Sequence, residues 1–334
     1  MKKKILFAAP SHFEIYKIII RNLENLGFEV VYLNTNDESF KYKNNKDRII
    51  NLFRKIFLKD KNYKKITLTD RYKTQKNLEQ LKSYDKNYFN YSLIIRSDLY
   101  PIEVINRIIV LCKKSIAYQW DGLNRYPEVF KRIDFFDKFY IFDNKDFEQY
   151  QQTYSNLYLT QNFYPTIEPT LNTKNCDVFY IGTYNEGRFD SFINLYARLS
   201  NFDLTFNIMI NSDDQNIIKK YQNKDIRFFS KPIMYEENLS LLKSAKIVLD
   251  VKVNHHSGLS FRFFEALKYG VKVITDNSTV KEYDFYHPNN IYILNQDNDT
   301  PEILERFINS EYSEIDLSTL KKYSFDSWIT ELLN

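Results

Sequence analysis

The chain has 334 residues, of which 43% are apolar and 27% charged, a globular composition with room for two domains. The net charge is only +4, and no apolar run reaches about 18 residues, which excludes a transmembrane helix. Two isolated cysteines, Cys112 and Cys176, match no disulfide or metal-binding pattern, so we expect a protein of the reducing cytoplasm.

Strands alternate with helices through the first half of the chain, which predicts an α/β domain with a parallel sheet. The predicted strands are Lys4–Ala9, Glu29–Leu33, Ser92–Arg96, Ser115–Gln119, Phe139–Phe142 and Asn156–Leu159. The predicted helices are Glu14–Leu26, Ile102–Cys112 and Asp146–Gln152.

The segment Lys41–Asn87 is strongly basic, with fifteen Lys and Arg residues against five Asp and Glu, an excess of ten positive charges. Within it, apolar residues recur on one helical face and cations surround them. The apolar residues are Ile49, Ile50, Phe53, Ile56 and Phe57, and the cations are Arg48, Arg54, Lys55 and Lys59. A basic amphipathic helix indicates contact with an anionic membrane surface. The alternative is a helix docked on its own domain, with lysines that reach past it to solvent.

Two turns in this half follow predicted strands, and such turns face the ligand crevice of an α/β domain. His12 lies in the first turn, where it could contact a substrate or act as a base; the alternative is a helix cap. Asp121 lies in the second turn, at the carboxyl end of a strand, and is a candidate general base for a substrate hydroxyl. The alternative for Asp121 is the cap of a helix over Tyr126–Phe135.

A stretch of little periodicity, Gln161–Asn175, holds two of the eight prolines and is interpreted as a linker. We place the linker at residues 164–176, between a first domain at 1–163 and a second at 177–324. The second half again alternates. Its predicted strands are Asp177–Gly182, Leu204–Ile210, Ile226–Phe229, Ile247–Val251 and Val271–Asp276. Its predicted helices are Asp214–Tyr221, Glu236–Ser244, a segment between Gly258 and Gly270, Pro301–Ser310, Leu317–Tyr323 and Phe325–Leu333.

The helix between Gly258 and Gly270 is the most informative element. The chain has only six glycines, and these two punctuate one helix, with Gly270 at the position of a C-terminal cap. The preceding loop offers backbone N–H groups and the positive end of a helix dipole, which favour a phosphate or diphosphate. Arg262 and Glu265 share one face, so a cation and a carboxylate lie near that anion site. The alternative is an ordinary surface ion pair between them.

The core face of the same helix is predicted to hold Leu259, Phe263, Ala266 and Leu267. A second candidate anion site follows the strand that ends at Gly182, where Thr183 and Arg188 accompany a turn into a helix. Adjacent His255 and His256 lack the spacing of metal ligands. The acidic residues Asp213 and Asp214 follow a strand and are predicted to cap a helix. We therefore expect no divalent metal and no separate cofactor.

The motif Ser-Gly-Leu-Ser-x-Arg-x-Phe-Glu-Ala-Leu-x-x-Gly-Val-x-Val-Ile-Thr-Asp, from Ser257 to Asp276, resembles the donor-site signature of group 1 glycosyltransferases of the GT-B fold. It is most similar to the spore-maturation-protein-like branch. The resemblance implies two Rossmann-like domains with parallel sheets that face an interdomain cleft. It also implies that the final helix, residues 325–334, crosses back to the first domain.

The resemblance also implies roles for individual residues. Glu265 would hold the ribose of a sugar nucleotide, and Arg188 and Arg262 would reach its diphosphate. The diphosphate would rest on a loop made of His256, Ser257, Gly258, Leu259 and Ser260. Lys231 and Met234 would lie near the nucleotide base. Many retaining members carry a second glutamate where this chain has Ser257, so the stereochemical course stays open.

These features predict a glycosyltransferase that moves a sugar from a nucleotide-diphosphate donor to a glycan or lipid-linked acceptor of a bacterial surface polysaccharide or lipopolysaccharide. Asp121 or His12 would then be the acceptor-side base. We expect a cytoplasmic enzyme, peripheral at the inner face of the cell membrane. A sugar-nucleotide epimerase of the same architecture is the alternative. A basic nucleic-acid-binding protein is disfavoured because no nucleic-acid module is visible.

Overall fold

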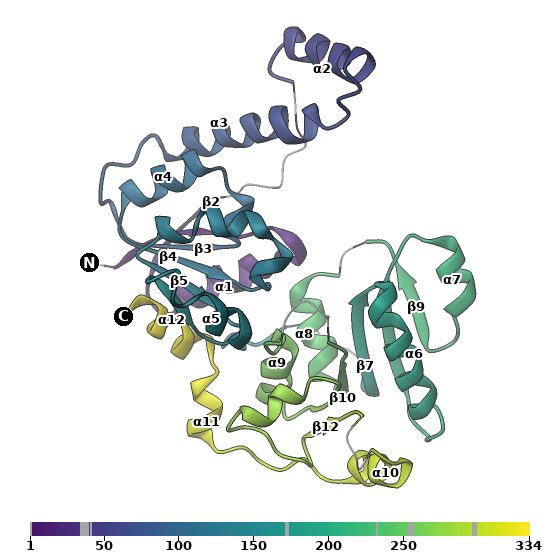
Figure 1. Ribbon diagram of the computed structural model, residues 1–334. Coiled ribbons are helices and arrows are strands. Elements are labelled where there is room, and N and C mark those ends of the chain that lie inside the picture. Colours follow the sequence, from purple (N-terminus) through teal and green to yellow (C-terminus); the bar gives the residue numbers. More distant parts are fainter. Residues whose placement is uncertain are drawn as a thin grey trace.

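The computed structural model describes residues 2–33, 40, 42–170, 174–231, 233–252, 257–295 and 299–334, with the side chains of His12, Lys65 and Ile66 excepted. Two separate sheets of six strands organise this part of the chain, and all of their strand pairs are parallel. Helices cover both sheets, and the two resulting units lie beside one another (Figure 1). We call them the first and the second domain.

The first domain is built on the sheet β2-β1-β3-β4-β5-β6. Its strands are β1 (Lys4–Ala8), β2 (Glu29–Leu33), β3 (Phe89–Ile95), β4 (Cys112–Gln119), β5 (Lys138–Ile141) and β6 (Leu157–Leu159). Its helices are α1 (Ile15–Asn25), α2 (Asn45–Phe57), α3 (Thr69–Leu81), α4 (Ile102–Leu111) and α5 (Asn144–Tyr150). The central strands are buried on both faces, as the near-continuous apolar runs of β1 and β3 require. Helix α2 stands away from the sheet, beyond the end of α3 (Figure 1).

The second domain is built on the sheet β12-β11-β10-β7-β8-β9. Its strands are β7 (Cys176–Thr183), β8 (Phe206–Asn211), β9 (Ile226–Phe229), β10 (Ala245–Asp250), β11 (Lys272–Thr275) and β12 (Ile291–Ile293). Its helices are α6 (Glu186–Leu199), α7 (Gln215–Tyr221), α8 (Tyr235–Lys243), α9 (Phe261–Tyr269) and α10 (Pro301–Asn309). Helix α9 ends at Gly270, whose φ of +63° is the left-handed conformation of the predicted cap. Asp214 caps α7, as predicted, by accepting from the amides of Asn216 and Ile217.

The last two helices, α11 (Leu317–Lys322) and α12 (Phe325–Leu333), carry the chain back to the first domain (Figure 1). Phe325, Trp328, Ile329 and Leu332 of α12 are buried in the same apolar cluster as residues of β1, β3 and β4. Where the chain crosses back, the Phe325 amide donates to the Tyr164 carbonyl over 2.9 Å. The two chain segments that join the domains therefore run side by side.

The domains are also joined directly, between the end of β5 and the loop before α9. Asp143 follows β5, and its carboxylate accepts from the backbone amides of Ser257 and Gly258 and from the Ser257 hydroxyl. Phe142 packs so closely on Gly258 that a Cβ there would lie 2.5 Å from Phe142 Cδ2 and 2.8 Å from its carbonyl oxygen. Gly258 is thus required by the contact between the domains, in addition to its place before the helix.

We predict that Gly258→Ala destabilises the protein by about 1–3 kcal/mol, because backbone and ring atoms of Phe142 must move to admit the methyl group. Gly187→Ala is the matched control. It lies in the first turn of α6, and its new Cβ would meet nothing closer than Asn185 Oδ1 at 3.8 Å, so stability should hold or rise slightly. Urea unfolding of both variants measures the difference. Equal stabilities would contradict the close contact at Gly258.

Candidate active site between the two sheets

A cavity of about 440 Å³ lies between the two domains, where the carboxyl ends of both sheets face each other. Residues that follow β1, β3 and β4 form its first-domain wall: Pro10, Phe13, Ile15, Arg96, Trp120, Asp121, Arg125 and Tyr126. Residues at the ends of β7, β8 and β9, in the turn before α8, and on α8 and α9 form the opposite wall: Ile181, Gly182, Thr183, Asn211, Phe229, Ile233, Tyr235, Asn238 and Phe261. A ligand here would touch both domains.

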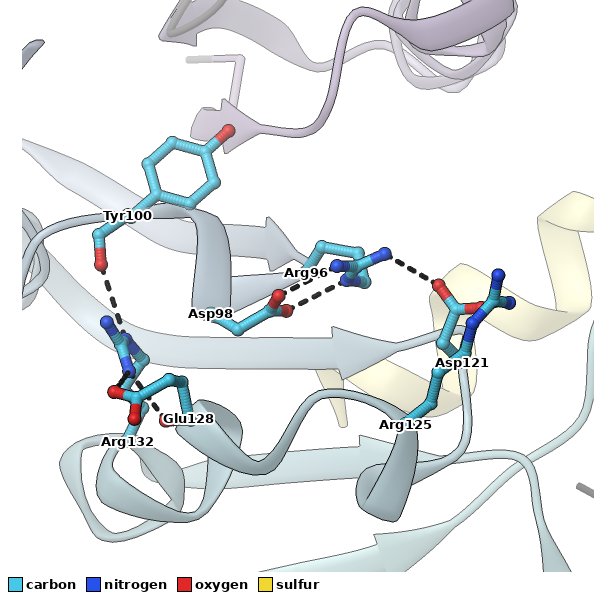
Figure 2. A network of polar contacts seen from close by, with 7 residues as sticks. All are labelled: Arg96, Asp98, Tyr100, Asp121, Arg125, Glu128 and Arg132. Atoms are coloured by element: carbon cyan, nitrogen blue, oxygen red, sulfur yellow. Dashed lines mark hydrogen bonds and ion pairs between the residues drawn. The ribbon is translucent and has the colours of Figure 1, made fainter. Parts of the chain in front are cut away.

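A network of four charged residues holds the first-domain wall (Figure 2). Arg96, just after β3, pairs with both carboxylate oxygens of Asp98 over 2.8 and 2.7 Å. Its remaining amino group donates to Asp121 Oδ2 over 2.7 Å, and Arg125 donates to Asp121 Oδ1 over 2.7 Å. Burial alone would lower the pKa of Arg96, but the carboxylates of Asp98 and Asp121 outweigh it and raise the pKa. The guanidinium is therefore a fixed cation of the wall.

This network positions the loop after β4 and places Asp121 at the cavity. The Arg96 guanidinium lies over the ring of Tyr126 at 3.7 Å, so the Tyr126 ring is held against the wall. Each oxygen of Asp121 accepts one guanidinium hydrogen bond and keeps a lone pair that a ligand hydroxyl could use. Asp121 is not a helix cap, because 3₁₀ turns rather than the alternative helix over Tyr126–Phe135 follow it.

Backbone strain also occurs along the same wall. Phe13, Glu14 and Arg96 all have φ near +60°, which bulky residues rarely adopt. Phe13 is half exposed and lines the cavity, and Arg96 anchors the network above. Such outliers cluster at ligand sites, where the surrounding structure holds them. The backbone of His12 lies in the turn before Phe13, but its side chain is outside the described structure.

On the opposite wall, two arginines flank Gly182 at the carboxyl end of β7. Arg188, from the first turn of α6, donates to the carbonyl of Thr183 over 2.7 Å. Arg262, from α9, donates to the carbonyl of Ile181 over 2.9 Å. Both guanidinium groups are thus held beside a stretch of backbone that lines the cavity, and each keeps further N–H donors. Neither arginine is among the residues that line the cavity, so the pair lies beside the Ile181–Thr183 backbone rather than on the wall itself.

Arg262 and Glu265 do not form the surface pair considered as the alternative, because each has another partner. Arg262 donates to Asp250 Oδ1 over 2.7 Å, and the Ser260 hydroxyl donates to the same oxygen. Glu265 is only 2% exposed and accepts a 2.5 Å hydrogen bond from the hydroxyl of Tyr235, which lines the cavity. Burial raises the pKa of Glu265 to about 6, although the Tyr235 hydrogen bond opposes this shift.

The loop before α9 has a different arrangement from the open anion site expected of it. Asp143 occupies the amides of Ser257 and Gly258, and its pKa is lowered because these hydrogen bonds outweigh its burial. Leu259 is buried in the core, as predicted, and its carbonyl accepts from Asn162. His255 and His256 lie outside the described residues. The described part of this loop therefore joins the domains.

Lys231 and Met234 were expected near a nucleotide base, but other residues line this part of the cavity. Lys231 is exposed, and neither it nor Met234, the residue before α8, lines the cavity, whereas Phe229 and Ile233 do. Asn238 of α8 also lines it, and its buried Oδ1 has no hydrogen-bond partner among the described residues. A ligand N–H or O–H group could satisfy this acceptor.

Several residues of the site were not singled out from the sequence: Arg96, Asp98, Asp143, Tyr235, Asn238 and Asp250. Arg96 and Asp250 carried a signal, since each is a charged residue at the carboxyl end of an apolar strand. The others depend on partners far along the chain. Tyr235, for example, meets Glu265 thirty residues later.

The fold has clear counterparts among solved structures. No protein-family model matches the sequence, and a search of curated proteins finds no match. The lipopolysaccharide outer core galactosyltransferase WaaB in its apo form is 15% identical, with a TM-score of 0.54 over 98% of this chain and 97% of that chain. An alpha-glucosyltransferase in complex with UDP-glucose and DNA containing an abasic site is 14% identical, with a TM-score of 0.54 over 100% and 95%.

The catalytic domain of starch synthase IV from Arabidopsis thaliana, bound to ADP and acarbose, is 8% identical and has a TM-score of 0.58 over 99% of this chain and 98% of that chain. These structures are GT-B glycosyltransferases. The predicted fold class is confirmed: two Rossmann-like domains with parallel sheets on an interdomain cleft. At these identities the likeness establishes the fold alone.

The burial of Glu265 predicts a specific pH dependence of stability. Its pKa is about 6 in the folded protein against an ordinary 4.5, so the folded state binds this proton more tightly and loses stability as the pH rises through that window. The charged form should cost about 2 kcal/mol above pH ~6. The stability of Glu265→Gln relative to wild type should therefore rise by about 2 kcal/mol between pH ~4.5 and ~7.

Urea unfolding at both pH values measures this change, with Glu236→Gln as the control. Glu236 lies in the first turn of α8. Hydrogen bonds from Thr170 lower its pKa despite some burial, so its contribution to stability is already complete above pH ~4.5. Its relative stability should not change across the window. A flat difference for Glu265→Gln would show that the carboxyl is not desolvated.

Proposed function

We propose that this protein is a bacterial glycosyltransferase that moves a hexosyl or related group from a nucleotide-diphosphate sugar to a glycan or lipid-linked acceptor of a surface polysaccharide or lipopolysaccharide. One observation carries the proposal. Arg188 and Arg262 bracket the backbone of Gly182 and Thr183 on the wall of a cavity between two Rossmann-like domains. Two fixed cations beside a strand's carboxyl end fit a diphosphate.

In this proposal the diphosphate binds at the end of β7, since Asp143 holds the Ser257 and Gly258 amides. The guanidinium groups of Arg188 and Arg262 would stabilise the negative charge that develops on the leaving diphosphate. Because these cations supply the charge, we propose that transfer needs no divalent metal. Asp250 holds Arg262 in place and leaves it further N–H donors for phosphate oxygens.

The nucleoside would occupy the part of the cavity lined by Phe229, Ile233 and Asn238. A flat base would pack against these apolar side chains, and the unpaired Asn238 Oδ1 can accept from a base or ribose group. Glu265 would act on the ribose with Tyr235, which lines the cavity and donates its hydroxyl hydrogen bond to the buried carboxylate. Direct contact of the ribose with Glu265 would require Tyr235 to move aside.

The acceptor would lie against the first-domain wall, where a sugar ring can pack on Trp120. Asp121 would accept the acceptor hydroxyl's hydrogen bond, and His12 is the other candidate for this role. In an inverting reaction the acceptor oxygen attacks the anomeric carbon, and the bond from that carbon to the diphosphate breaks with its electron pair. The acceptor's proton passes to the base. Arg96 and Arg125 hold the carboxylate of Asp121 in position for this step.

Substitution of Arg262 and Glu265 tests the donor site. We predict that Arg262→Lys and Glu265→Gln each lower kcat/KM for donor turnover at least about tenfold, since lysine lacks the additional directed N–H donors of the guanidinium and glutamine lacks the carboxylate charge. Arg262→Lys keeps a cation for Asp250 and avoids the unfolding that an unpaired buried carboxylate could cause in Arg262→Ala. Arg306→Ala, an exposed arginine of α10, is the matched control and should keep wild-type activity.

The assay follows nucleotide diphosphate release with and without acceptor. Release that requires the acceptor supports transfer, whereas an epimerised donor formed without acceptor would replace this proposal with an epimerase. Wild-type activity in both Arg262→Lys and Glu265→Gln would place the donor elsewhere. Tyr235→Phe separates two possibilities: a loss comparable to Glu265→Gln indicates that the ribose is held through the Tyr235 hydroxyl.

A further inference from the structure

Helix α2 exposes an unusually apolar face. Five of its side chains on one face are between 52% and 70% exposed: Ile49, Leu52, Phe53, Ile56 and Phe57. The rings of Phe53 and Phe57 pack on each other 4.9 Å apart. No residue of α2 is buried, and the helix stands beyond α3, away from both sheets (Figure 1). The alternative of a helix docked through its apolar face does not hold for the described structure.

The opposite face of α2 attaches it to the first domain. Asp47 lies 4.0 Å from Arg71 of α3, and Arg54 pairs with Asp60 over 3.3 Å in the segment that leads to α3. The Arg54 guanidinium also lies over the ring of Tyr63 at 4.4 Å. These contacts all lie on one side of the helix, so the attachment itself turns the five apolar side chains outward.

Positive charge borders this apolar face. Arg48 and Lys55 are exposed and lie one turn before and after Leu52, at the edge of the face, and exposed Lys59 follows the helix. The surrounding segment, Lys41–Asn87, has an excess of ten positive charges, whereas the rest of the chain is net negative, since the whole chain carries only +4. The cations therefore gather where the apolar side chains are exposed.

These features distinguish between possible occupants of the face. Within the described residues, every helix is too short or too polar to span a lipid bilayer. A second copy of the chain packed face to face would bring the Arg48 and Lys55 side chains of both copies together, and like charges oppose such pairing. An anionic bilayer surface satisfies both features, because its acyl boundary takes up apolar side chains and its headgroups attract the bordering cations.

We propose that α2 is a membrane-surface anchor that lies in the plane of an anionic bilayer, with Ile49, Leu52, Phe53, Ile56 and Phe57 in the acyl boundary and Arg48 and Lys55 at the headgroups. This proposal deepens the proposed function, on which it rests for one point: a lipid-linked acceptor would be held at the surface that α2 binds. The anchor stands apart from the cavity residues, so its loss should not impair the chemical step.

Vesicle flotation of the full chain tests the anchor. Wild-type protein should float with phosphatidylcholine vesicles that contain about a third phosphatidylglycerol, and about tenfold less with phosphatidylcholine alone. Phe53→Ser/Phe57→Ser should lose most of this binding, and Arg48→Glu/Lys55→Glu should lose the preference for anionic vesicles. Leu317→Ser is the matched control, because Leu317 is an apolar side chain 81% exposed on α11, and its binding should stay at wild-type level.

Three results would overturn the proposal: no flotation of the wild type, equal binding to both kinds of vesicle, or equal loss in Leu317→Ser. A dimer in light scattering that Phe53→Ser/Phe57→Ser converts to a monomer would assign the face to a second copy instead. Transfer to a water-soluble acceptor should be unchanged in Phe53→Ser/Phe57→Ser. A chain that binds anionic vesicles but transfers no sugar would refute the proposed function and leave the anchor standing.

Discussion

One buried carboxylate, Asp143, connects the two domains at the point on which the candidate site depends. It follows the first-domain strand β5, caps α5 and holds the amides of Ser257 and Gly258 in the second domain. Two charge-assisted hydrogen bonds from backbone amides fix a loop far better than side-chain contacts at a surface would. Because α9 begins three residues after Gly258, this bond also sets where Arg262 and Glu265 lie relative to the first-domain wall.

The charged groups of the cleft follow a common plan in which each is held by a partner yet keeps capacity for a ligand. Asp121 lies between two arginines, and Arg262 lies between Asp250 and the carbonyl of Ile181. Groups held in this way need little reorganisation when a charged substrate binds, which is the property that electrostatic catalysis requires. Glu265 differs, because it is buried and hydrogen-bonded to Tyr235, and of these two residues only Tyr235 lines the cavity.

Much of the fold could be predicted from the sequence because the information is local. Apolar periodicity predicted the core face of α9, Gly270 predicted where α9 ends, and Asp214 predicted where α7 begins. All three predictions are confirmed. The order of strands and helices indicated parallel sheets, and the Ser257–Asp276 motif added the GT-B plan. The amphipathic helix α2 was also visible, although its face includes Leu52 rather than the half-buried Ile50.

The partners of charged side chains could not be predicted, because they join residues distant in the chain. Arg262 and Glu265 share a helical face, which suggested that they pair with each other. In the fold, Arg262 instead donates to Asp250 of β10, and Glu265 accepts from Tyr235 of α8. Gly258 likewise suggested a phosphate loop, and only the approach of Phe142 reveals its second role. Ser257 is buried against Asp143 and does not line the cavity.

The central claim is that the end of β7, between Arg188 and Arg262, holds a diphosphate. Calorimetric titration with the common nucleoside diphosphates and their monophosphates tests it most directly. We predict that at least one diphosphate binds about tenfold or more tightly than its monophosphate, and that Arg188→Ala removes most of this difference while leaving monophosphate affinity unchanged. Equal affinities for the two nucleotides, or an undiminished preference in Arg188→Ala, would contradict the account.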